Sequence, residues 1–165
     1  MRSILVDPVA QSVEIFDVDP GQHFADVRQA IGAEHLSVVV LGRFFGRRGV
    51  EQLLIDDEGL LSHRGPQAFT LVKNQPIAGR FVIVCEAPDM LADGDDEDED
   101  HAAGHQHRTY LLDVDFGPQD VRDRLKFVTP AFAKASIDLQ MARARAHFEA
   151  EGIAYTELRP DWRKE

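Results

Sequence analysis

The chain has 165 residues, 44% of them hydrophobic, with a single cysteine and a formal net charge of −11. This composition excludes a disordered chain and predicts one domain of ordinary size with a real core. It also excludes an intrachain disulfide and a cysteine zinc cluster. No apolar run approaches the roughly 20 residues that a membrane helix needs, so we expect a cytoplasmic protein without membrane contact.

The negative charge is concentrated in one stretch. Residues 86–100 carry nine acids and no base, which leaves 20 acids against 18 bases in the rest of the chain. A DNA mimic needs acidity spread over a surface, and an ordinary nucleic-acid-binding domain needs a basic excess. The distribution therefore argues against both classes.

The first 59 residues contain strand patterns and one helix pattern, separated by turns and loops that contain glycine. We predict antiparallel strands at residues 2–6 and 12–18, a short helix that begins at Asp19 or Gln22 and runs to Ile31 with Gly32 as its cap, strands at 35–41 and 51–56, and a loop at 42–49.

Residues 81–85, Phe-Val-Ile-Val-Cys, form an unbroken apolar run. Because alternate side chains of a strand point to opposite faces, such a run must be covered on both sides. We therefore expect this segment to be the central strand. Residues 68–72 are expected to form a short strand or helical turn, and residues 74–76 to lead into the central strand.

The C-terminal part has a strand pattern at residues 109–116, followed by Gly117-Pro118 and a helix whose apolar face reaches Val128. Thr129 suits a helix N-cap and Pro130 the first helical turn, so a second helix is expected to run to about Glu151, with Gly152 as its stop. One apolar stripe of that helix comprises Phe132, Ala135, Leu139, Ala142 and Ala146. A last short strand is expected at residues 153–158.

These elements predict an α+β fold: a mixed or antiparallel sheet with one short helix, plus a C-terminal strand-helix-helix extension. We expect an α/β domain at residues 1–86, a flexible acidic and histidine-rich linker at 87–107, and an extension at 108–165 that packs on the first domain.

Several short motifs lie between residues 2 and 88: Val6-Asp7-Pro8, Ile31-Gly32 before the strand at residues 36–40, Leu54-Ile55-Asp56-Asp57-Glu58-Gly59-Leu60-Leu61, Asn74, and Ile77-Ala78-Gly79 before an apolar strand. Through these motifs, residues 2–88 resemble a small α/β domain of unknown function that recurs in proteins of phages, plasmids and integrative elements. The resemblance implies a bacterial mobile-element accessory protein that acts on host defence or regulation, and it implies no catalytic residues.

Two segments are candidates for binding a partner. The loop residues Arg43, Phe44, Phe45, Arg47 and Arg48 combine bases that pair with carboxylates or phosphates with aromatic rings typical of interfaces. Alternatively, the phenylalanines turn into the core. The acidic residues Asp96, Asp98 and Asp100 suit a basic partner surface, or serve as a solubilising spacer.

The only metal-like composition is His101, His105 and His107 beside the acidic residues, since neutral imidazoles and carboxylates bind transition metals. A solvated linker explains the same residues, and we predict no cofactor. No residue is predicted to be catalytic. Cys85 lies in the apolar run, the acids at 56–58 suit a turn, and Asp113 and Asp115 suit a solvent face.

We therefore expect a non-enzymatic accessory protein of a phage or plasmid that binds and modulates a protein partner, such as a host-defence or regulatory factor. The alternatives are a nucleic-acid-associated regulator that uses the loop from Arg43 to Arg48, and a metal-dependent enzyme that uses the histidine tract. A homodimer through residues 130–151 is a further expectation.

Overall fold

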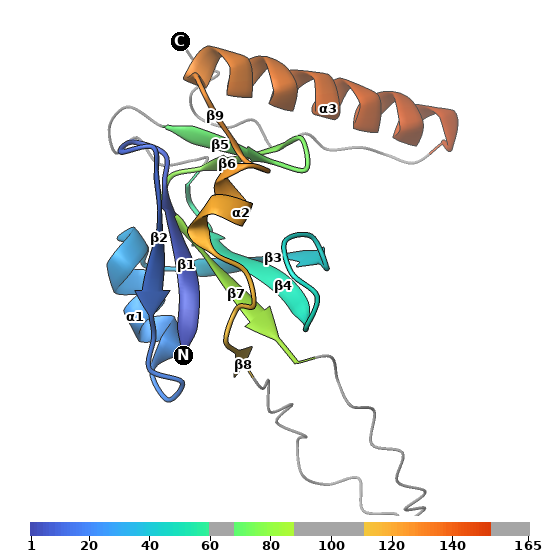
Figure 1. The fold of residues 1–165 in the computed structure, drawn as a ribbon. Coiled ribbons are helices and arrows are strands. Elements are labelled where there is room, and N and C mark those ends of the chain that lie inside the picture. The colour runs from blue at the N-terminus through green and yellow to red at the C-terminus, as the bar shows by residue number, and fades with distance from the viewer. Residues whose placement is uncertain (60–67, 88–110, 153–165) are drawn as a thin grey trace, which may run out of the picture.

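The computed structural model describes residues 1–59, 68–87 and 111–152, in which two antiparallel sheets and three helices form an α+β fold (Figure 1). The predicted fold class is confirmed. The predicted linker, apart from Ala87, and the predicted last strand lie outside the described residues.

The larger sheet has the strand order β2-β1-β7-β4-β3, and every neighbouring pair is antiparallel. Its strands are β1 (Arg2–Asp7), β2 (Ser12–Asp17), β3 (Leu36–Gly42), β4 (Val50–Asp56) and β7 (Phe81–Glu86), with β8 (Leu111–Leu112) paired to the end of β7.

β7 is the middle strand, as its sequence predicts, and residues 81–85 are each no more than 1% exposed. Phe81, Ile83 and Cys85 belong to the larger core cluster, whereas Val82 and Val84 belong to the cluster that includes Val27 of helix α1 (His23–Ile31). The alternation of side chains therefore places half of the run in each core, which explains why it contains no polar residue.

The second sheet has the order β6-β5-β9 and corrects one prediction. Residues 74–76 do not lead directly into β7, because Lys73 and Asn74 both adopt positive φ and reverse the chain between β5 (Phe69–Val72) and β6 (Gln75–Ala78). Two central residues with positive φ are the requirement of a tight hairpin turn, and asparagine tolerates this conformation well.

The C-terminal part also departs from prediction. Helix α2 (Pro118–Arg122) is shorter than expected, because β9 (Lys126–Val128) leaves it to pair with β5. Of the strand expected at 109–116, the described residues form only the short β8. Val114, which follows β8, is fully buried and donates its N–H to the Arg2 carbonyl. Tertiary pairing thus overrides the local helical pattern at residues 126–128.

Helix α3 (Pro130–Ala150) matches its predicted limits: the Thr129 side chain accepts from the Phe132 N–H, and Gly152 adopts positive φ. Ala133 packs into a small cluster with Phe69 and Ala78, and the second half of the helix extends beyond the second sheet (Figure 1). Within the described ranges, no helix combines the length and apolar character that a membrane crossing requires.

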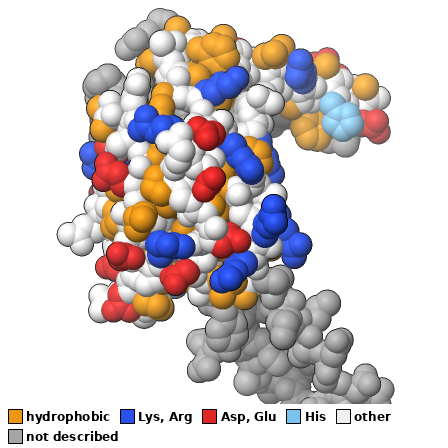
Figure 2. Space-filling view, in the orientation of Figure 1, with side chains coloured by type: hydrophobic (Ala, Val, Ile, Leu, Met, Phe, Trp, Pro, Cys, Tyr) orange, Lys and Arg blue, Asp and Glu red, His pale blue; other side chains and the backbone are white. Residues whose placement is uncertain are grey.

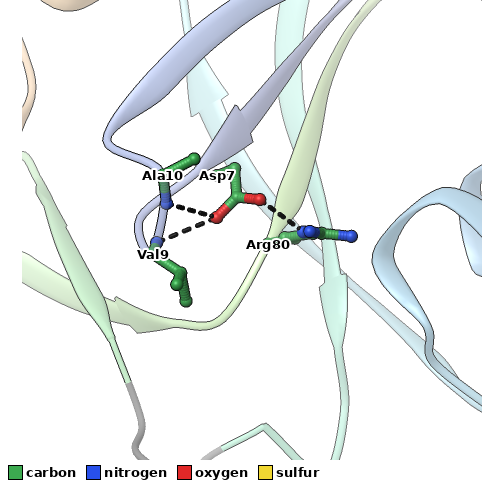
Figure 3. A network of polar contacts seen from close by, with 4 residues as sticks. All are labelled: Asp7, Val9, Ala10 and Arg80. Carbon is green, nitrogen blue, oxygen red and sulfur yellow. Dashed lines mark hydrogen bonds and ion pairs between the residues drawn. The ribbon is translucent and has the colours of Figure 1, made fainter.

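Asp7 links the β1–β2 turn to the start of β7 (Figure 3). One carboxylate oxygen accepts from the N–H groups of Val9 and Ala10 at 2.8 and 3.1 Å, and the other pairs with Arg80 Nε at 2.7 Å. Burial raises the pKa of Asp7, but the hydrogen bonds from Ala10, Arg80 and Val9 outweigh it and hold the pKa below its ordinary value of 3.8.

This contact makes the stability of the fold pH-dependent. Because the pKa of Asp7 is lower in the folded than in the unfolded chain, its contribution is complete above pH 3.8 and is lost as the pH falls through the folded value. We expect Asp7→Asn to lower the unfolding free energy by about 2 kcal/mol at neutral pH, and by less near pH 3.

Urea denaturation at both pH values measures this difference. Asp17→Asn is the matched control, because Asp17 is an exposed carboxylate of the neighbouring strand. A difference between Asp7→Asn and wild type that does not change with pH would contradict the assignment.

Candidate binding surface

The loop between β3 and β4, at residues 43–49, is fixed by hydrogen bonds to a buried carboxylate. Glu51 is 1% exposed, and its oxygens accept from the N–H groups of Phe44, Phe45 and Gly46 at 2.7, 2.7 and 2.5 Å. The next amide, that of Arg47, donates to the Asp115 carboxylate at 3.1 and 3.3 Å. Four successive amides therefore face two fixed carboxylates.

Two glycines allow this close approach. A Cβ at Gly46 would collide with the Asp115 carboxylate and the Phe116 ring, and one at Gly49 would collide with Cys85 Sγ and the Glu86 carbonyl. The loop therefore requires glycine at both positions, and the glycines predicted only as interruptions have a packing role.

The two loop phenylalanines have different environments. Phe45 is 6% exposed and packs against Phe116, with 5.5 Å between ring centroids. Phe44 is half-buried and meets Phe45 edge-on, with 4.7 Å between centroids. Phe45 thus belongs to the core, as the alternative interpretation of the sequence expected, and it offers no contact area to a partner.

Two cations from distant parts of the chain flank Phe44. Lys73, in the β5–β6 turn, lies 4.9 Å from the ring centroid and donates to the Leu41 carbonyl. Arg124, between α2 and β9, lies 5.9 Å from the same centroid and donates to the Phe44 carbonyl. Both cations are within reach of a cation–π interaction with the ring.

We call the resulting surface the basic rim. Its five members are the exposed side chains of Arg43, Arg47, Arg48, Lys73 and Arg124. In Figure 2, Lys and Arg side chains gather at the edge of the molecule where Figure 1 places the β3–β4 loop. The structure therefore brings the three predicted arginines together with two bases that sequence reasoning missed.

No local sequence signal could have found Lys73 and Arg124. Each is an isolated base in its own segment, and their shared neighbour is the Phe44 ring, which is 29 residues before Lys73 and 80 before Arg124 in the chain. Only the pairing of β5 with β9 brings the two segments to one side of the loop.

The other predicted candidates stand as follows. The acidic residues Asp96, Asp98 and Asp100 and the histidines His101, His105 and His107 lie outside the described residues. Within residues 1–59, 68–87 and 111–152, no group of three or more histidine, cysteine or acidic side chains could hold a metal ion.

The remaining acidic candidates accept hydrogen bonds from neighbouring groups of the fold. Asp56 accepts from the Glu58 N–H in the turn after β4, and Asp57 accepts from the Ser37 hydroxyl. Asp113 accepts from the Arg2 N–H at 2.6 Å, so Asp113 and Asp115 fix two different backbone segments.

Cys85 is 1% exposed in the larger core cluster. Burial, together with the negative charges of Glu51 and Asp115, raises the pKa of its thiol to about 11 from an ordinary value of 9.0. Both effects disfavour the thiolate, which is the reactive form. This environment is that of a packing residue and not of a nucleophile.

Comparisons with models of protein families, with curated proteins and with solved structures find no match to this chain. The resemblance of residues 2–88 to the mobile-element domain thus remains a prediction.

We expect Glu51→Gln to destabilise the protein by about 2–3 kcal/mol, because an amide places a donor against loop N–H groups that need an acceptor. Urea denaturation measures the loss. Glu58→Gln, at an exposed turn, is the matched control and should change stability by less than about 0.5 kcal/mol. Equal effects of the two substitutions would contradict the role of Glu51.

We expect the Cys85 thiol to react with a disulfide reagent at about pH 8 more than 100-fold more slowly than a free cysteine. The rate is followed by absorbance, with and without denaturing urea. Rapid labelling of the native protein, at a rate close to that in urea, would show that the thiol is accessible.

Proposed function

We propose that this protein is a non-enzymatic interaction protein that binds an acidic surface of a protein partner through the basic rim. The observation that carries the proposal is the convergence of five exposed cations from three chain segments on one loop whose backbone is already fixed. Arginine pairs with carboxylates through two parallel hydrogen bonds, which gives directional recognition.

The charge balance of the rim supports an anionic partner. Among the described residues, two acids, Glu51 and Asp115, accept hydrogen bonds from the loop amides, and they number fewer than the five cations. The surface thus has an excess of positive charge. Because the loop is held in place before binding, a partner loses little free energy in ordering it.

A protein partner fits the rim better than nucleic acid. Outside residues 86–100 the chain has 20 acids and 18 bases, so it lacks the basic excess that is typical of domains that bind a phosphate backbone. Phe44 is packed on Phe45 and flanked by two cations, so its ring is not a free platform for base stacking.

The role that we propose for this binding is that of a mobile-element accessory protein, which uses the rim to modulate a host-defence or regulatory protein. The resemblance of residues 2–88 supports this context. The nucleic-acid-associated regulator is an outcome of the test below, and the metal-dependent enzyme depends on histidines outside the described residues.

The proposal is tested with an immobilised polyglutamate peptide and a single-stranded oligonucleotide of equal charge, at low and at physiological salt. We expect the peptide to bind more tightly than the oligonucleotide and to weaken as salt rises. Arg48→Glu should weaken peptide binding about tenfold, because it removes one attraction and adds one repulsion.

Arg28→Glu is the matched control, since Arg28 is an exposed arginine on helix α1. It should leave peptide binding within about twofold of wild type. Tighter binding of the oligonucleotide would favour the nucleic-acid-associated regulator. Absence of peptide binding at low salt, or equal effects of Arg48→Glu and Arg28→Glu, would overturn the rim as the binding surface.

A further inference from the structure

Helix α3 exposes a row of apolar side chains on the face that points away from the body. Ala133, which is fully buried, marks the face toward the body. At about 100° per residue, Phe132, Ala135, Leu139, Ala142 and Ala146 fall on the other side of the helix. All five are exposed, and the two large ones, Phe132 and Leu139, are each 53% exposed.

The spacing of this row is that of a helix–helix seam. The five residues follow one another at intervals of three, four, three and four, and Glu149 takes the next position. Intervals that average 3.5 residues keep a stripe facing a second helix along its length. We call the six positions from 132 to 149 the seam.

The packing of α3 gives a physical reason for a partner. Ala133 is the one residue of Pro130–Ala150 that is buried, and Gln140 donates to the Asn74 carbonyl. The helix is about 31 Å long and its second half extends beyond the second sheet (Figure 1). Helices in water gain most of their stability from packing of an apolar face, and the seam is the face of α3 that the described part of the chain leaves exposed.

We infer that the seam binds the seam of a second copy of this chain, with the two helices antiparallel. In the register that we assign, Leu139 lies opposite Ala142 of the second copy, and Ala135 lies opposite Ala146. Each Leu139 then meets an alanine and not a second leucine, and the adjacent layers pair alanine with alanine. A parallel arrangement would instead place Leu139 against Leu139 and alanine against alanine.

The charges beside the seam fit the same register. Asp138 and Arg145 lie seven residues apart along one border of the seam. When the helices run antiparallel, Asp138 of each copy faces Arg145 of the other, and the two-fold symmetry makes this pair twice. On the other border, Arg143 faces Ser136. The antiparallel pair therefore creates two attractions and no like-charge contact.

This dimer is independent of the basic rim, which involves no residue of α3. Because the seam is short and mostly alanine, we expect weak association that depends on concentration. Sedimentation velocity of the full chain from micromolar to millimolar concentration measures it. Leu139→Glu should weaken the dimer at least about 100-fold, since Leu139 packs in two symmetric layers.

The control is His147→Glu, an exposed position of α3 outside the seam, which should leave association within about threefold of wild type. Far-UV circular dichroism shows whether each variant keeps its helix content. A wild-type chain that stays monomeric at every concentration, or a folded Leu139→Glu variant that associates like wild type, would overturn the inference.

A charge exchange tests the orientation. Asp138→Arg and Arg145→Asp should each weaken the dimer about tenfold, because each turns two attractions into repulsions. The variant with both substitutions restores opposite charges at both contacts and should return to within about threefold of wild type. Failure of the double variant to recover would contradict the antiparallel register.

Discussion

The burial of one carboxylate at the start of β4 determines the shape of the surface that we propose to be functional. Glu51 faces the larger core cluster, where an unpaired charge would be costly, and three loop amides surround it as donors. The same contacts satisfy backbone groups that a tight loop would otherwise leave unpaired. The carboxylate and the loop thus require each other, and the arginines project from a backbone that both have fixed.

The basic rim joins parts of the chain that fold in different sheets. Its loop connects two strands of the larger sheet, Lys73 belongs to the β5–β6 turn, and Arg124 precedes β9. Phe44 packs on Phe45 and lies close to both cations. The rim is therefore a property of the assembled fold, and loosening either sheet would separate its members.

The two proposed surfaces complement each other. The rim uses charge fixed on a rigid loop, whereas the seam uses an apolar face of a projecting helix. A two-fold dimer through the seam would carry two rims, and a partner with repeated acidic surfaces would then bind with a higher effective concentration at the second site. This arrangement would compensate for the modest and salt-dependent strength of a single charged contact.

Local sequence signals are sufficient to predict some of the elements. The run at residues 81–85 predicted a strand covered on both faces, and Thr129 and Gly152 marked the ends of α3, because periodicity and capping act within a few residues. Tertiary structure decided what depends on distant partners. In the folded chain, residues 126–128 form β9 and not the predicted helix. Phe45 is buried, and Lys73 and Arg124 lie beside Phe44. Strand pairing and core packing join residues far apart in the chain, and their free energy exceeds the local preferences that a sequence pattern reports.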